Sequence, residues 1–195
     1  LQQITPYFPG NMALSAGGNE EDAYLYGKYS GEELKALGIN FNLAPVLDVN
    51  NNKDNPVIGV RSYGENPQRV SKLGSAYIKG LQENGIIATG KHFPGHGDTD
   101  VDSHHDLPQL KFDKTRLDSL EIFPFKELIA AGAPSVMVAH MNIPSLDATP
   151  NIPSSISKKV VTDLLRNELG FKGLTVTDAM DMNGVKKFFP NGEAD

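Results

Sequence analysis

Residues 86–108 read IIATGKHFPGHGDTDVDSHHDLP, a short apolar segment that runs directly into a long polar loop. The apolar part, residues 86–91, predicts a β-strand, and the Gly, His and Asp residues that follow predict a loop at its carboxyl end. Three further segments also predict strands: residues 40–49 (NFNLAPVLDV), 135–140 (SVMVAH) and 173–177 (GLTVT). The chain therefore repeats one pattern, a strand that ends in polar residues.

Apolar residues at helical spacing separate these predicted strands. They cover residues 19–37 before the first strand, 67–84 after it, 114–131 after the second and 157–169 after the third, with Pro124 as a break in the third helix. Strands that alternate with helices indicate a parallel α/β arrangement, either an open doubly wound sheet or part of a (β/α)8 barrel.

The positions of the polar residues favour the barrel. Asp48, Lys91, His92, His140 and Asp178 all fall at the carboxyl ends of predicted strands, where barrel enzymes assemble their sites. An open sheet binds ligands near one switch point, and neither a GxGxxG motif nor a P-loop is present. A complete barrel takes about 250 residues and eight strands. We therefore expect the incomplete central portion of a (β/α)8 TIM barrel, with the whole chain in a single domain.

The composition limits the class of protein. Of the 195 residues, 39% are hydrophobic, enough for a core, and the formal net charge of -6 argues against nucleic acid as a partner. The absence of cysteine excludes a disulfide scaffold, a thiolate zinc site and a cysteine nucleophile. No apolar run approaches the roughly 20 residues of a membrane span, so none is expected in this segment. The composition leaves the compartment open.

The loop of residues 91–108 holds four of the five histidines and four aspartates. One use of such a cluster is to bind Zn or Mn, although no HExxH spacing is present. The other is proton transfer, because Asp102 and His104 lie two residues apart and can meet across Ser103 in an extended loop. A carboxylate beside an imidazole fixes its tautomer and leaves the other ring nitrogen to exchange protons. We expect this dyad to act with neither a metal nor a cofactor.

Asp178 ends the fourth predicted strand in the segment LTVTDAMDM, residues 174–182. An aspartate directly after a strand often caps a helix. A carboxylate at one strand end and a proton donor on a neighbouring loop are also the two components of retaining glycoside hydrolysis. Together with the dyad, Asp178 is therefore a candidate nucleophile.

Cationic residues at the same strand ends suit a sugar. Arg61, Lys91 and His92 can supply charge-assisted donors for hydroxyl groups, although Arg61 could instead pair with Asp48 or Glu65. His140 is more typical of a residue that supports a site than of one that reacts.

The segments KHFPGHGDTDVDSHHDLP, NLAPVLDVN, VIGVRSYGENP and LTVTDAMDM closely resemble glycoside hydrolase family 3, in its β-N-acetylglucosaminidase branch. The resemblance spans nearly the whole chain and implies a (β/α)8 barrel. It implies that Asp178 is the nucleophile, that His104 is the general acid/base and that Asp102 orients it. The implied substrates are peptidoglycan fragments or other terminal β-GlcNAc glycosides. The expected sugar ligands are Arg61, Lys91, His92, His140 and Asp48.

Two features of the family lie outside this sequence. Members usually carry an Asp-Glu-Gly-Gly stretch on the preceding strand, and the last barrel strands are expected beyond residue 195. Two other functions remain open from the residues alone. One is a metal-dependent hydrolase that uses the loop of residues 91–106, and the other is a carbohydrate-binding remnant without turnover.

Overall fold

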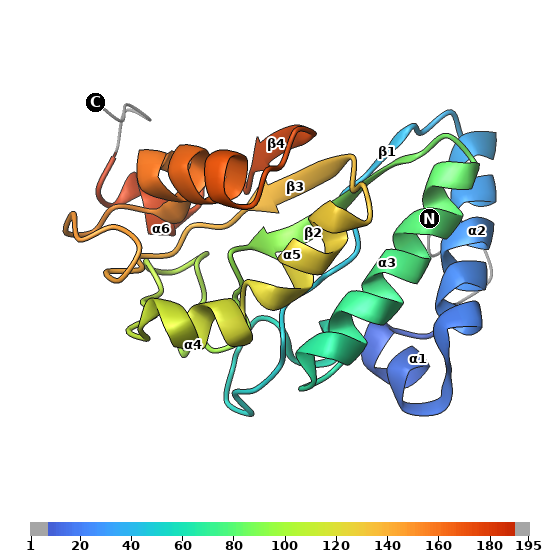
Figure 1. Ribbon diagram of the computed structural model, residues 1–195, viewed down its shortest axis with the longest axis horizontal. Coiled ribbons are helices and arrows are strands. Elements are labelled where there is room, and N and C mark those ends of the chain that lie inside the picture. Colours follow the sequence, from blue (N-terminus) through green and yellow to red (C-terminus); the bar gives the residue numbers. More distant parts are fainter. Residues whose placement is uncertain (1–7, 190–195) are drawn as a thin grey trace.

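The computed structural model describes residues 8–189. Its sheet has four strands, which neighbour one another in chain order and are all parallel (Figure 1). They are β1 (Phe41–Asn42), β2 (Ile87–Phe93), β3 (Ser135–Val138) and β4 (Leu174–Thr177). Parallel neighbours require a crossover between them, and helices supply it here.

The helices begin and end close to where the spacing predicts them. α2 (Glu20–Ala36) starts at Asn19, whose side chain accepts from the backbone of Asp22 in a capping box. α3 (Pro67–Glu83) starts with a proline and is capped by Asn66. The other helices are α1 (Asn11–Gly17), α4 (Lys114–Ser119), α5 (Phe123–Ala130), α6 (Asn183–Lys186), the 3-10 helices η1 (Gly59–Arg61) and η2 (Ser154–Ile156), and the π-helix η3 (Lys159–Glu168).

Two of the predicted elements differ from those observed. The predicted strand of residues 40–49 is regular only at β1, although an isolated bridge continues the pairing from Val46 to Lys91. Pro45 interrupts the ladder because it has no N–H to donate, while its carbonyl still accepts from Lys91. The predicted helix of residues 114–131 is split between α4 and α5, and Pro124 occupies the first turn of α5.

The core lies between the sheet and the helices α3 and α5. Glycines allow a close approach there: a Cβ on Gly74 of α3 would stand 2.3 Å from Leu47, and one on Gly90 of β2 would stand 2.4 Å from Leu128 of α5. These contacts show which face of β2 the helices cover. Since side chains alternate along a strand, Lys91 projects to the opposite face.

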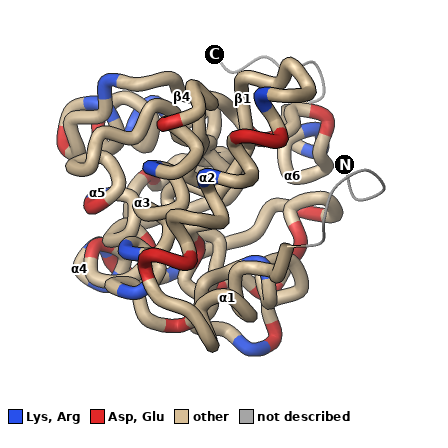
Figure 2. Tube along the Cα trace, turned by 90° about the vertical axis from the view of Figure 1, so that its right-hand side faces the viewer, with Lys and Arg blue, Asp and Glu red and all other residues tan. Residues whose placement is uncertain are grey.

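The two outer strands leave apolar side chains accessible. Leu43, next to β1, is 44% exposed, and Leu174 of β4 is 54% exposed. Acidic and basic residues are interspersed along the backbone trace in Figure 2. Within residues 8–189, none of the helices is both long and apolar enough to cross a membrane.

Candidate active site

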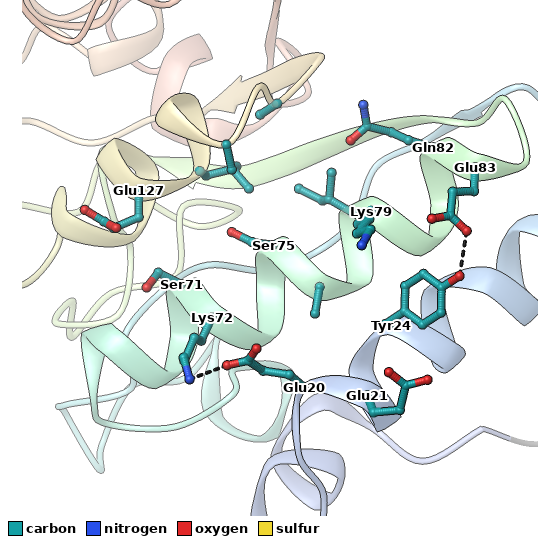
Figure 3. A pocket seen from close by; sticks show the side chains of 15 residues that line it. Glu20, Glu21, Tyr24, Ser71, Lys72, Ser75, Lys79, Gln82, Glu83 and Glu127 are labelled. Atoms are coloured by element: carbon teal, nitrogen blue, oxygen red, sulfur yellow. Dashed lines mark hydrogen bonds and ion pairs between the residues drawn. The ribbon is translucent and has the colours of Figure 1, made fainter.

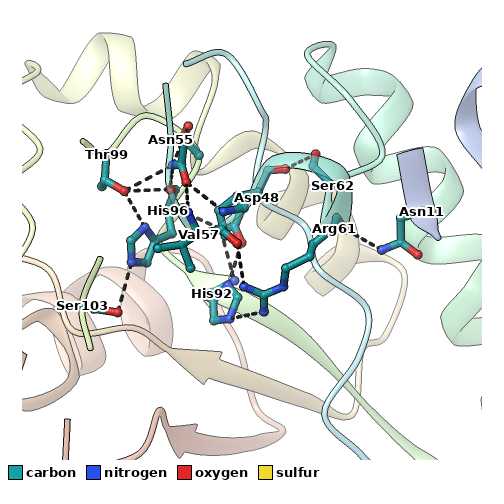
Figure 4. A network of polar contacts seen from close by, with 12 residues as sticks. Asn11, Asp48, Asn55, Val57, Arg61, Ser62, His92, His96, Thr99 and Ser103 are labelled. Atoms are coloured by element: carbon teal, nitrogen blue, oxygen red, sulfur yellow. Dashed lines mark hydrogen bonds and ion pairs between the residues drawn. The ribbon is translucent and has the colours of Figure 1, made fainter. Parts of the chain in front are cut away.

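A buried carboxylate organises the carboxyl ends of β1 and β2. Asp48 has no exposed surface, and its Oδ2 lies 2.7 Å from Nδ1 of His92 (Figure 4). Its Oδ1 accepts from the backbone N–H of His96 at 2.7 Å. Burial raises the pKa of Asp48, but the charge and hydrogen bond of His92, with those of His96, outweigh it and hold the pKa below its ordinary value. Asp48 is therefore ionised and fixes the His92 ring with a proton on Nδ1.

Arg61 approaches the other side of the same imidazole. Its Nη2 lies 3.5 Å from His92 Nε2, and its Nη1 donates to the carbonyl of Val57 at 3.1 Å. Within residues 8–189, it forms no ion pair with Asp48 or Glu65. The guanidinium of Arg61 therefore continues the chain of contacts that runs from Asp48 through His92, as Figure 4 shows.

Lys91 lies beside this group on the opposite face from the helices. Burial, followed by the charge of Arg61, lowers the pKa of Lys91, whereas the carboxylates of Asp178 and Asp48 act to raise it. The ends of β2 and β4 thus bring a cation and Asp178 within electrostatic range. Lys91 and Arg61 also line a hollow of about 320 Å³.

Asn55 joins the two loops that follow β1 and β2. Its side-chain nitrogen donates to the carbonyls of His96 and Gly97 at 2.9 and 3.1 Å, and its oxygen accepts from Val57 and Ile58. Gly97 packs directly on the first loop, because a Cβ there would stand 1.8 Å from the carbonyl oxygen of Val49. These contacts of Asn55 and Gly97 therefore fix the start of the loop that follows β2, which we call the histidine loop.

An arginine on α4 also holds the start of this loop. Arg116 of α4 donates to both carboxylate oxygens of Glu121 at 2.6 Å and to Asp98 at 3.0 Å. Asp98 also accepts from Asn51. The loop that carries His104 is thus tied to α4 as well as to the loop after β1.

Asp102 and His104 meet as the sequence predicts, but in a different backbone conformation. Nδ1 of His104 lies 2.7 Å from Oδ1 of Asp102, which also accepts from the His104 backbone. The segment is a turn and is not extended, since the N–H groups of His105 and Asp106 both donate to the Asp102 carbonyl. Burial raises the pKa of Asp102, but the two hydrogen bonds from His104 outweigh it and lower the pKa. The His104 side chain is 64% exposed and so is accessible to a substrate.

Asp178 follows β4 directly, and its N–H continues the ladder to the carbonyl of Val138 at 2.9 Å. The register pairs Val136 with both Gly90 and Thr175, so alternation places Asp178 on the face that Lys91 occupies. The backbone N–H of Ala179 donates to Oδ1 of Asp178 at 2.8 Å. The carboxylate is therefore oriented by its own turn.

His140 supports that turn from the end of β3. Its Nε2 lies 3.0 Å from the carbonyl of Ala179 and its Nδ1 lies 2.7 Å from the Ser155 hydroxyl. Burial lowers the pKa of His140, more than the Ala179 carbonyl and Asp178 raise it. The ring is fully buried and neutral, with Nε2 donating and Nδ1 accepting.

Two of the expected sugar ligands have protein partners. Asp48 is engaged by His92 and His96, and both ring nitrogens of His140 have partners. Asn55 and His96 were not singled out by the sequence. His96 belongs to the histidine loop, but nothing in the sequence around Asn55 indicates that it spans two loops.

Other features of the molecule bear on the alternatives. Within the described residues, no three His, Asp or Glu side chains converge as a metal site requires. A larger hollow of about 770 Å³ lies against α2, α3 and α5 (Figure 3). Its charged groups belong to exposed helix surfaces, as in the pair of Lys72 with Glu20. It contains none of the residues at the strand ends.

Parallel βα units with polar side chains gathered at the carboxyl ends of the strands define the class of (β/α)-barrel proteins. Residues 1–194 match the glycosyl hydrolase family 3 N-terminal domain. The chain belongs to this family, and the predicted TIM-barrel fold is confirmed.

Relatives support the same assignment. The chain is 45% identical to "Beta-hexosaminidase A" of Pseudoalteromonas piscicida, over 93% of this chain and 33% of that protein. Among solved structures, it resembles a glycoside hydrolase family 3 β-N-acetylglucosaminidase from Paenibacillus sp. str. FPU-7, with a TM-score of 0.93, 50% identity, and coverage of 95% of this chain and 35% of that one.

The β-N-acetylglucosaminidase from Thermotoga maritima is more distant, with a TM-score of 0.84 and 32% identity, covering 96% of this chain and 39% of that one. The chain therefore spans about a third of the length of these three relatives.

Proposed function

We propose that the protein is a retaining exo-β-N-acetylglucosaminidase, with Asp178 as nucleophile and His104 as general acid/base. The observation that carries the proposal is the contact of 2.7 Å between Asp102 and an exposed His104 ring. It is the arrangement of an imidazole prepared for proton transfer. The names of the relatives, a β-hexosaminidase and two β-N-acetylglucosaminidases, support the sugar.

The reaction has two steps. An oxygen of Asp178 forms a bond to the anomeric carbon while the bond from that carbon to the glycosidic oxygen breaks, and His104 gives its Nε2 proton to the departing oxygen. Water then attacks the anomeric carbon, gives a proton back to His104, and releases Asp178 as a carboxylate. Asp102 keeps the Nδ1–H of His104 engaged throughout, so that Nε2 remains the nitrogen that exchanges protons.

A histidine in this role has an electrostatic advantage. After it gives up its proton it is neutral, whereas a carboxylic acid would become a second anion beside Asp178. Two carboxylates at the separation of about 5 Å that is typical of retaining glycosidases repel each other. The neutral form of His104 also avoids repulsion with an acidic glycoside. We propose peptidoglycan fragments, or other terminal β-GlcNAc glycosides, as substrates.

Three side chains are proposed to hold the sugar. Arg61 and Lys91 are the donors for its hydroxyl groups, and His92 presents Nε2 beside the Arg61 guanidinium. Asp48 positions His92 and does not reach the substrate, because it has no exposed surface.

The experiment is to trap the intermediate. The reagent is an N-acetylglucosaminyl fluoride with a second fluorine on the sugar ring, in which the anomeric fluoride is the leaving group. It should label the protein with one sugar, and peptide mapping should place that sugar on Asp178. Asp178→Ala should remove both the label and the hydrolysis of an aryl β-GlcNAc, whereas Asp181→Ala, at an exposed site three residues later, should keep both. Label on another residue would overturn the proposal, and so would loss of activity with a chelator alone.

A further inference from the structure

The dyad sits on a turn that is closed by its own hydrogen bonds. The N–H groups of His105 and Asp106 donate to the carbonyl of Asp102, at 2.9 and 3.1 Å, and the side chain of Asp102 accepts from the backbone and the ring of His104. A displacement of the backbone at one end of this turn therefore displaces the His104 ring with it.

The turn rests on α6 and on Lys187, the residue that directly follows this helix. The N–H of Gly184 donates to the carbonyl of Ser103 at 3.0 Å, and Nζ of Lys187 contacts both carboxylate oxygens of Asp106, at 3.0 and 2.9 Å. These two contacts join segments about 80 residues apart in the chain. They bracket His104, because one contacts the residue before it and the other contacts the end of the turn.

A side chain at Gly184 would fit tightly. A Cβ on this residue would stand 3.0 Å from the Ser103 carbonyl oxygen, 3.3 Å from that of Asp106 and 3.5 Å from Cβ of His140. Two of these atoms belong to the backbone of the turn. A methyl group at this position would therefore require the backbone of the turn to shift by a few tenths of an ångström.

α6 is itself fixed relative to Asp178. It begins five residues after Asp178, and the side chains of Met182 and Val185 bury it in the molecule, the latter with no exposed surface. His140 holds the intervening Ala179 carbonyl. The acid/base and the nucleophile are thus linked through one short connection.

We propose that α6 sets the position of the His104–Asp102 dyad relative to Asp178, with Gly184 and Lys187 as positioning residues for the acid step. The proposal rests on the function proposed above. In this proposal α6 has a role in protonating the leaving group, and it has no role in the attack of Asp178 on the anomeric carbon.

The decisive variant is Gly184→Ala, with Asn183→Ala at an exposed position of the same helix as its control. Alanine favours a helix more than glycine does, so α6 itself is retained. Two substrates separate the steps: phenyl β-GlcNAc needs protonation to lose phenol, and 2,4-dinitrophenyl β-GlcNAc does not. A misplaced acid should lower kcat/KM, which reports the first step alone, about tenfold for the phenyl glycoside and less than about threefold for the dinitrophenyl glycoside.

Either of two results overturns the proposal. One is an unchanged kcat/KM of Gly184→Ala for the phenyl glycoside, and the other is an equal loss of kcat/KM on both substrates. If thermal unfolding shows that Gly184→Ala does not fold, Lys187→Met decides, with the exposed Lys186→Met as control. An exposed ion pair is weak, so a two- to fivefold loss confined to the phenyl glycoside is expected, and Lys187→Arg should restore the rate. If Lys187→Met and Lys186→Met show the same activity on the phenyl glycoside, Lys187 is not a positioning residue.

A second readout needs no substrate. Hydrogen exchange at the amides of His105 and Asp106 should be faster in Lys187→Met than in Lys186→Met, because the turn has lost a contact. Unchanged exchange overturns the contact itself. Failure of the proposed function has a different signature: Asp178→Ala would then keep its activity on both glycosides, whatever the α6 variants do.

Discussion

Nδ1 of His92 lies 2.7 Å from Oδ2 of Asp48, a carboxylate with no exposed surface that comes from a segment 44 residues earlier in the chain. This contact joins the ends of β1 and β2 and orients a ring at the centre of the candidate site. Because both partners are buried, the contact affects the stability of the protein as well as the geometry of the proposed sugar site.

Asp48→Asn keeps the shape of the side chain and removes its charge. We expect the free energy of unfolding at pH 6 to fall by about 2 kcal/mol, the usual size for a hydrogen bond to a charged group, and KM to rise. The folded pKa of Asp48 is below its unfolded value of about 3.9, so its contribution is complete above that pH and is lost as the pH falls through the folded pKa. Urea unfolding at pH 6 and pH 3.5 should show the difference shrinking.

Asp54→Asn is the matched control, since this aspartate lies on the same loop with 77% of its side chain exposed. It should change the unfolding free energy by less than about 0.5 kcal/mol. An Asp48→Asn deficit that stays constant down to pH 3.5 would show that lost charge is not its cause.

His104→Ala should slow glycosides with poor leaving groups by about 100-fold or more, the range for loss of a general acid. For activated aryl glycosides kcat/KM, which reports the first step alone, should fall much less. Asp102→Asn should act in the same direction to a smaller extent, because it leaves the ring in place without the carboxylate that orients it. Steady-state kinetics on a series of aryl β-GlcNAc substrates measures this dependence, and His105→Ala is the control. Equal slowing across the series would remove His104 from the acid step.

Gly97→Ala should destabilise the protein by about 1–3 kcal/mol, the usual cost of overpacking. Its Cβ would stand 1.8 Å from the Val49 carbonyl oxygen, a backbone atom that cannot move without the loop that carries it. Gly17→Ala is the control, because no atom lies within 4 Å of a Cβ there. Urea unfolding compares the two variants, and equal stability would contradict the close packing of the two loops.

His140→Gln should weaken the dependence of stability on pH between about 7 and 5. Burial lowers the folded pKa of His140, whereas the unfolded value is about 6.5. The unfolded chain therefore binds a proton first as the pH falls, and stability decreases with it. His96, whose pKa burial also lowers, keeps part of this dependence in the variant. Unfolding free energies at pH 7, 6 and 5 test the slope, and an unchanged slope would contradict a neutral buried His140.

Local pattern was sufficient for most of the fold. Apolar runs bounded by Gly and Pro located the strands, and caps such as Asn66 with Pro67 located the helix starts, because these signals act within a few residues. Pro45 shortened the first strand through its missing N–H. The Asp102–His104 contact was also predictable, since two residues of separation allow it in a turn as well as in an extended loop.

The sequence alone determined which residues stand at the ends of the strands, because apolar runs and turn residues are read along the chain. The tertiary structure decided which of them touch. Asp48 is placed behind His92, Asn55 spans two loops, and Gly184 lies beneath the turn that carries His104. Contacts between segments 40 to 80 residues apart depend on how helices and strands pack, and no local propensity encodes that distance.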